Sequence, residues 1–167
     1  MAAVGGLLFL WRRYRAAVKA ASESTADVAT AADDQALCEK YKNFTVPADE
    51  CRQLLNRLNN IMEQDRMYTN PDLKIEDLAT AVGVSSHTLS YVFSQYLKRN
   101  YYDYINDYRI SEFKRLVNNG DHMAYTLDAL MKICGFNSRT TFFRYFKKVN
   151  GTTPSKYIKT VTSRTDA

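Results

Sequence analysis

Apolar residues recur at helical spacing from residue 47 onward, and no comparable pattern precedes residue 45. Within residues 47–68 they fall three and four positions apart. Asp49 and Glu50 stand near the start of this run, where acidic side chains favour the positive end of a helix. The pattern predicts a first helix that Tyr68–Pro71 ends. Its apolar positions are Cys51, Leu54, Leu55, Leu58, Ile61 and Met62.

The next pattern occurs twice. KIEDLATAVGVSSHTLSYVFSQYLKRN (residues 74–100) and YTLDALMKICGFNSRTTFFRYFKKVNG (residues 125–151) align at an offset of 52, which becomes 53 after one inserted residue. A repeat of this length can indicate a solenoid, but two copies are too few for one. Two copies of a small structural unit agree better with the pattern. Aligned pairs include Ile75/Leu127, Leu78/Leu130, Gly83/Gly135, Ser85/Ser138, Phe93/Phe146 and Tyr104/Tyr157.

Each copy has the sequence features of a helix-turn-helix unit. A short helix of about eight residues is followed by a glycine, an apolar residue, a serine and a second helix. Gly83 and Gly135 stand where a helix ends in the left-handed conformation, which glycine tolerates best. Ser85 and Ser138 stand where a side-chain oxygen can cap the following helix.

The second helix of each copy is predicted to bury one stripe and expose the opposite face. In the later copy Arg139, Thr140, Phe143, Arg144, Lys147 and Lys148 fall outside the stripe formed by Phe142, Tyr145, Phe146 and Val149. In the earlier copy Ser86, His87, Ser90, Tyr91 and Ser94 fall outside the stripe formed by Leu89, Val92, Phe93 and Tyr96. For Phe143 two interpretations stay open: contact with a thymine methyl group, or packing on the first helix of its unit.

A long helix is predicted between the two copies, over residues 101–118. At 1.5 Å per residue it is roughly 27 Å long. Asn118-Asn119-Gly120 stops it. Successive major grooves on one side of B-DNA lie about 34 Å apart, so such a helix can hold two reading units near that spacing.

The length gives room for one ordinary domain or two very small ones, and the charge distribution points to a polyanionic partner. The chain has 167 residues, of which 46% are hydrophobic and 13% aromatic, and its net charge is +5. Residues 129–165 contain eight basic residues and no acid, whereas residues 21–50 contain seven acids. This asymmetry favours nucleic acid as the partner of the C-terminal part. A merely solvated basic face is the alternative.

The N-terminal residues 1–15 form an apolar tip with a basic flank, MAAVGGLLFLW followed by RRYR. The apolar part is shorter than the roughly 20 residues that span a bilayer. Two interpretations stay open: the end of a transmembrane helix with its cytoplasmic flank, or an interfacial tail. The expected location is cytoplasmic, with or without a membrane tether through residues 1–15. Residues 16–45 are expected to be a linker.

The sequence contains no motif typical of an enzyme or of a metal-binding protein. The three cysteines lack a CxxC spacing and the two histidines, His87 and His122, lie far apart. The nucleotide-binding, serine-hydrolase and zinc-protease motifs GxGxxG, GxxxxGK[ST], GxSxG and HExxH do not occur. We expect neither an enzyme nor a cofactor.

The stretch GFNSRTTFFRYFKKVNGTTPSKY, residues 135–157, resembles the DNA-binding domain of the AraC/XylS family of bacterial transcription regulators. DLATAVGVSSHTLSYVF and YDYINDYRISEFKRLV extend the resemblance to about residues 50–160. It implies an all-α, seven-helix module with two helix-turn-helix units joined by a long helix, here residues 46–162 with a tail at 163–167. The residues that fit the family signature are Gly135, Phe136, Ser138, Phe142, Arg144, Phe146, Lys147, Gly151, Thr153, Pro154 and Tyr157.

The resemblance also implies a function: sequence-specific binding of double-stranded DNA through two neighbouring major grooves, commonly in transcription activation with RNA polymerase as a partner. A helical protein–protein adaptor and a non-specific DNA-binding module are the alternatives. By position, the base-reading candidates are Ser86, His87, Ser90, Tyr91, Arg139, Thr140, Phe143 and Arg144. The phosphate-binding candidates are Lys98, Arg99, Lys147, Lys148 and Lys156.

Two positions depart from the family pattern. Lys98 stands where a glycine is usual after the first reading helix, so we expect either a left-handed lysine at a cost of about 1 kcal/mol or a different helix end. Met131 replaces a usual alanine and is expected to make a bulkier contact. Pro154 is expected to open the last helix.

Overall fold

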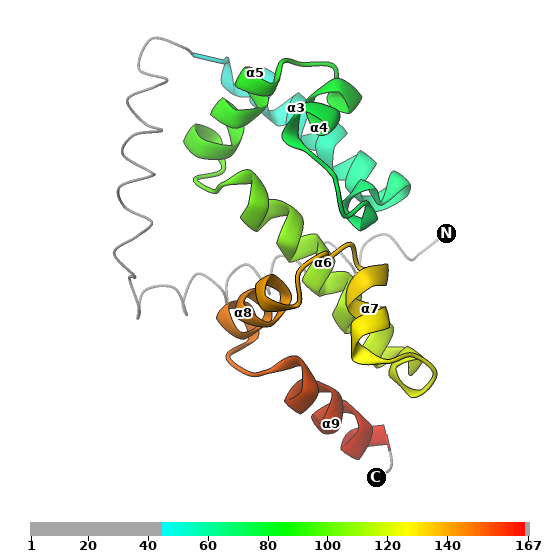
Figure 1. The fold of residues 1–167 in the computed structure, drawn as a ribbon. Coiled ribbons are helices and arrows are strands. Elements are labelled where there is room, and N and C mark those ends of the chain that lie inside the picture. Colours follow the sequence, from blue (N-terminus) through cyan, green and yellow to red (C-terminus); the bar gives the residue numbers. More distant parts are fainter. Residues whose placement is uncertain (1–44, 166–167) are drawn as a thin grey trace. The chain divides into compact units, whose positions relative to one another are not determined.

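The computed structural model describes residues 45–165, and within these residues seven α-helices and no strand occur (Figure 1). This confirms the predicted all-α architecture. Residues 1–15, expected to form an apolar tip, and residues 16–44 of the expected linker lie outside the described residues. The helices are α3 (Ala48–Asn60), α4 (Ile75–Val82), α5 (Ser86–Tyr91), α6 (Tyr101–Asn118), α7 (Leu127–Ile133), α8 (Arg139–Asn150) and α9 (Pro154–Thr165).

The helix ends agree with the sequence prediction in most places. α6 has the expected bounds, and Gly120 lies just beyond it with a φ of 89°. Pro154 opens α9 as expected. α9 continues to Thr165, so the first residues of the expected tail, 163–165, are helical. None of the described helices is both long and apolar enough to cross a bilayer.

Hydrogen-bonded caps set the two helix-turn-helix turns. The hydroxyl oxygens of Ser85 and Ser138 accept from the backbone N–H groups of Thr88 and Thr141, at 3.0 Å and 3.2 Å. These bonds satisfy donors that the first turn of a helix leaves unpaired. In the first unit, Arg57 of α3 also donates to the Val82 carbonyl at 2.8 Å, which ties α3 to the end of α4.

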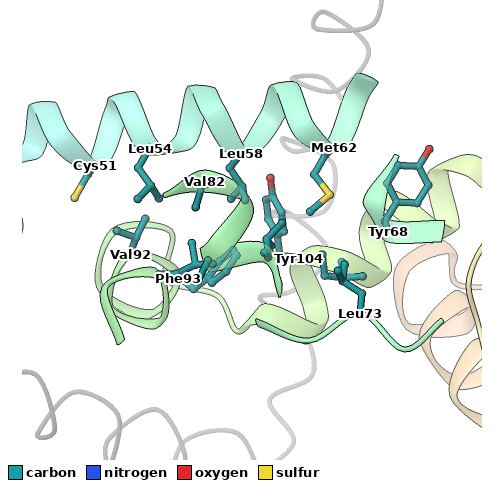
Figure 2. Packing of buried hydrophobic residues seen from close by; sticks show 14 residues of the cluster. Cys51, Leu54, Leu58, Met62, Tyr68, Leu73, Val82, Val92, Phe93 and Tyr104 are labelled. Carbon is teal, nitrogen blue, oxygen red and sulfur yellow. The ribbon is translucent and has the colours of Figure 1, made fainter. Parts of the chain in front are cut away.

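Two hydrophobic clusters form, and α6 belongs to both. The first cluster lies among α3, α4, α5 and the start of α6, where Tyr104 and Ile105 are buried. In Figure 2, Leu54 and Leu58 of α3 and Met62 just after it project toward the side of the cluster that holds Phe93 and Tyr104. The second cluster lies among α7, α8 and the later part of α6. The α6 residues buried there are Ile110, Phe113, Leu116 and Val117.

Ring contacts fix each reading helix to α6. Phe93, just after α5, packs against Tyr101 and Tyr104 with ring centroids 6.0 Å and 5.0 Å apart. Phe113 of α6 contacts Phe142 and Phe146 of α8 at 5.0 Å and 5.5 Å. The departing residue Met131 is buried in the second cluster, as expected of a bulkier contact.

The burial predicted for Tyr96 is wrong. Its side chain is 44% exposed, whereas Leu89, Val92 and Phe93 of the same predicted stripe are buried. The reason is a π-helical turn, Val92–Tyr96, that follows α5. A π turn contains more residues than an α turn, so later side chains leave the face that an α-helical period assigns to them.

The turn after this π segment contains the left-handed lysine that the sequence raised as one of two alternatives. Lys98 has a φ of 51°. The backbone N–H of Arg99 donates to the Phe93 carbonyl across the turn at 2.9 Å. A second π turn, Ile61–Asp65, extends α3 and ends at Arg66, also with a φ of 51°. The first helix therefore ends a little before the predicted Tyr68–Pro71.

The turn of the second unit packs against the segment that follows α3. A Cβ on Gly135 would lie 2.5 Å from the Tyr68 carbonyl oxygen and 2.9 Å from that of Thr69. Arg109 of α6 donates to the carbonyls of Tyr68 and Asn70, both at 2.8 Å. Gly135 is therefore required twice, by its φ of 90° and by the close approach of the two backbones.

A buried carboxylate strengthens the same junction. Glu112 of α6 is 6% exposed, and its carboxylate accepts from Arg115 at 2.8 Å and 2.9 Å and from Arg66. Burial alone would raise the pKa of Glu112, but the hydrogen bonds and charges of the two arginines hold it below its ordinary value. The ion pair therefore holds at neutral pH, and the stability that it contributes is lost as the pH falls through that depressed pKa.

Replacing Gly135 by alanine should destabilise the domain by about 2–5 kcal/mol, because a left-handed alanine costs about 1–2 kcal/mol and the overpacking about 1–3 kcal/mol. Gly120→Ala is the matched control, since Gly120 has a φ of 89° and nothing within 4 Å of its Cβ position. The control should lose about 1–2 kcal/mol. Urea unfolding compares the two variants, and equal losses would contradict the close approach at Gly135.

Lys98→Gly should raise the free energy of unfolding by up to about 1.6 kcal/mol. Relief of the left-handed conformation stabilises the folded state by about 1–2 kcal/mol. The greater freedom of glycine in the unfolded chain lowers the stability by about 0.4–1 kcal/mol. Lys98→Ala removes the same charge but keeps a Cβ, so it should bring no gain. A denaturation midpoint for Lys98→Gly no higher than that of Lys98→Ala would show that Lys98 is unstrained.

Candidate nucleic-acid interface

The exposed face of α8 contains polar and basic side chains in a single row. Thr140, Arg144 and Lys147 lie at i, i+4 and i+7, and all three are exposed. Phe142, Tyr145 and Phe146 are buried on the opposite side, as predicted. Among the described residues neither Arg144 nor Lys147 takes part in an ion pair. Both cations can therefore contact an external ligand without first breaking an ion pair within residues 45–165.

Arg139 begins α8 and is held from two sides. Its Nη1 lies 2.9 Å and 2.8 Å from the two carboxylate oxygens of Asp128 in the first turn of α7. Its guanidinium also lies over the Phe143 ring, 5.2 Å from the ring centroid. Phe143 is half-buried and packs on the second cluster and on Phe142, which favours the packing alternative left open by the sequence.

A polar junction joins α8 to the start of α6. The Tyr145 hydroxyl donates to the Asp107 carboxylate at 2.7 Å and lies 2.9 Å from the Asp103 carbonyl oxygen. Burial, together with the charges of Asp107 and Asp103, raises the pKa of Tyr145, so its hydroxyl keeps its proton. Lys148 lies 3.5 Å from the Asp103 carboxylate, so this expected phosphate ligand is partly engaged inside the domain.

Arg99, in the turn after α5, also takes part in this junction. Its guanidinium forms an ion pair with Asp107, and the two side chains are 27% and 20% exposed. Arg99 also donates to the Asp103 carbonyl at 3.3 Å. This partly buried pair engages Nη2 of Arg99 inside the domain, and the phosphate role expected for Arg99 stays a prediction.

The exposed face of α5 is neutral and shorter than that of α8. His87 is exposed, whereas Ser86 and Ser90 are half-buried. Tyr91 packs partly against the first cluster and lines a hollow of about 110 Å³ at the start of α3. Of the four base-reading candidates in α5, His87 is therefore the most accessible and Tyr91 is the most engaged in packing.

The remaining phosphate candidates flank the reading helices. Lys98 is exposed in the turn after α5, and Lys156 is exposed in the first turn of α9. Their exposure agrees with the expected contact to a polyanion. Sequence reasoning missed Asp128 and Asp103, the two acids that pair with the reading helix. Each lies on another helix, and no periodic pattern connects it to its partner.

The described residues contain no group of three or more His, Cys, Asp or Glu side chains able to hold a metal ion. Cys51 and Cys134 are buried and unbridged. Burial raises the pKa of Cys134 to about 12, so its sulfur stays protonated. Both cysteines act as small apolar side chains within the two clusters.

Comparison with known proteins agrees with this geometry. A family model described as a helix-turn-helix domain matches residues 78–160. "Probable transcription factor PqrA" of Proteus vulgaris is 31% identical over 104 residues, which cover 61% of this chain and 83% of that protein.

Two solved structures share the fold. The C-terminal domain of AraT, a response regulator from Geobacillus stearothermophilus, has a TM-score of 0.53 and 20% identity, covering 64% of this chain and 84% of that one. A protein of unknown function from Listeria innocua has a TM-score of 0.52 and 23% identity, covering 68% of this chain and 97% of that one. The relative from Proteus and the helix-turn-helix family model, together with the double helix-turn-helix architecture, show that the chain belongs to the AraC/XylS family of DNA-binding transcription regulators.

Proposed function

We propose that the chain binds promoter DNA at a specific sequence by placing α5 and α8 in two adjacent major grooves, and that it activates transcription from there. The observation that carries the proposal is the row of Thr140, Arg144 and Lys147 on α8. It combines a hydrogen-bonding side chain with two cations that form no ion pair within residues 45–165, on a helix whose other face is buried in the core. An α-helix with such a face fits the major groove of B-DNA.

The length and charge of each side chain on α8 decide whether we assign it to a base or to a phosphate. Arg144, at the centre of the row, is assigned to a base edge, where an arginine donates two hydrogen bonds to the O6 and N7 atoms of guanine. Thr140 and Arg139 are placed beside it at the start of the helix. Lys147 and Lys156 are assigned to phosphates, which position a protein on the duplex without reading its sequence. Phe143 supports Arg139 from the core side.

The first unit is assigned a weaker reading role. His87, Ser86 and Ser90 offer hydrogen-bonding groups but no fixed charge, so their contribution depends on close contact with base edges. Lys98 supplies the phosphate contact at the end of this unit. The proposal places both units on one face of the duplex, because each reading helix packs on the same helix, α6. Major grooves on one face recur about every 10 base pairs.

Activation requires a second surface that contacts RNA polymerase. Met123 and Tyr125, both between α6 and α7, are 78% and 51% exposed and lie two positions apart in the chain. In Figure 1 this segment lies at the end of α6 that leads into α7. We assign the polymerase contact to this region. The membrane contact expected of residues 1–15 stays a prediction.

Selection of the chain against a random duplex library tests the proposal. Two enriched blocks about 10 base pairs apart are expected. A single block would show that the first unit is structural. Salt-sensitive binding without enrichment would reduce the function to non-specific DNA binding, since counterion release alone produces it. An absence of binding would favour a protein–protein adaptor.

Arg144→Ala and Lys147→Ala should separate base reading from phosphate binding. Arg144→Ala should weaken binding to the selected duplex by about 1–3 kcal/mol and relax the preference at one base pair. Lys147→Ala should weaken binding to every duplex and reduce the slope of log K against log salt by about 0.9. Titrations at several salt concentrations measure both effects. Equal weakening of all sequences by Arg144→Ala would place Arg144 on a phosphate instead.

A further inference from the structure

Asp128 lies outside the reading helix α8 but contacts the first residue of that helix, Arg139. It lies in the first turn of α7, and both of its carboxylate oxygens bond Nη1 of Arg139. The two side chains are about half exposed, with 51% exposed for Asp128 and 62% for Arg139. The pair therefore lies at the domain surface, at the end of α8 where the base-reading candidates begin.

The geometry of the pair leaves most of the guanidinium available. An arginine has five N–H donors, on Nε, Nη1 and Nη2. Within the described part of the chain, Arg139 donates through Nη1 alone. Nε and Nη2 therefore keep their donors for an external acceptor. Reading guanine in the major groove requires two such donors in a fixed plane.

The Phe143 ring also holds the plane of the Arg139 guanidinium, in addition to Asp128. The guanidinium lies over the Phe143 ring at 5.2 Å, and Phe143 itself packs against Phe142 with ring centroids 5.6 Å apart. A free arginine loses much rotamer entropy when it is ordered on a ligand. Because Asp128 and Phe143 order Arg139 beforehand, less of that entropy remains to be lost on binding.

The negative charge of Asp128 also acts on DNA directly. Contacts with phosphates supply essentially all of non-specific binding. A carboxylate beside the reading helix repels the phosphates of DNA of any sequence. At the specific site, the contact between Arg139 and its base offsets this repulsion. Asp128 should therefore lower non-specific binding more than specific binding, which is how repulsive elements create specificity.

We propose that Asp128 is a specificity-determining positioning residue: by orienting Arg139, it makes the second unit select guanine at one base pair of the site. The inference rests on the proposed function, since it needs α8 to read bases. It adds a residue outside the reading helix whose effect on base preference is confined to a single base pair.

The repeat supplies a matched control. Glu76 occupies the position in α4 that corresponds to Asp128 in α7, and both are acidic residues in the first turn of a helix. The counterpart of Arg139 is Ser86, so the first unit lacks the pair. Among the described residues Glu76 forms no ion pair. Glu76→Ala therefore reproduces the loss of a negative charge at a helix start without the loss of an arginine contact.

The experiment measures binding of the full chain to the selected duplex, to versions with each base substituted at each position, and to a random-sequence duplex. Asp128→Ala should lose about tenfold or more in discrimination at one base pair, the same pair affected by Arg139→Ala. Its binding to random-sequence duplex should be unchanged or tighter. The double variant should discriminate no worse at that pair than Arg139→Ala alone.

Three outcomes would overturn the proposal. Asp128→Ala could behave like Glu76→Ala at every base pair, which would reduce Asp128 to a helix-start residue. Arg139→Ala could leave every base preference intact, which would remove Arg139 from reading. A wild-type chain that binds the selected and random duplexes equally would overturn the proposed function itself, and this inference with it. Unfolding midpoints by circular dichroism verify that all variants are folded.

Discussion

The shared helix α6 is the constraint on which the rest of the domain depends. Its first half is buried in one hydrophobic cluster and its second half in the other. Phe93 anchors the first reading helix near Tyr104, and Phe142 anchors the second on Phe113. The two anchor points on α6 are nine residues apart, or roughly 14 Å at 1.5 Å per residue. Neither reading helix can shift along α6 without opening a cluster, so their separation is a property of the core.

Contacts outside the clusters resist rotation about α6. The turn at Gly135 lies against the backbone of Tyr68 and Thr69, where a single added methyl group would clash. Arg109 and Glu112, both on α6, bond this same segment through its carbonyls and through Arg66. Two residues before Arg109 on α6, Asp107 accepts a hydrogen bond from the hydroxyl of Tyr145. These polar contacts lie between the two units and favour one relative orientation, which suits a protein that must match a regular duplex.

Local sequence patterns predicted the helices and turns because local physics determines them. Ser85, Ser138 and Gly120 act within a few residues of themselves, and the bounds of α6 follow from its periodicity. Tyr96 was misplaced because a π turn changes the period within a helix. The roles of Arg99 and Asp128 depend on partners on other helices, which periodicity does not specify. The repeat indicated which positions are equivalent, but it could not show that one copy had gained an ion pair.

The central claim is that α5 and α8 act as one rigid reading unit on two successive grooves. The most direct test is the affinity for duplexes in which two or five base pairs are inserted between the two halves of the binding site. If α6 holds the helices as described, a five-base-pair insertion turns one half-site to the far side of the duplex, and affinity should fall to that of a single half-site. An affinity that stays unchanged at both spacings would show that the two units move independently and would contradict the account.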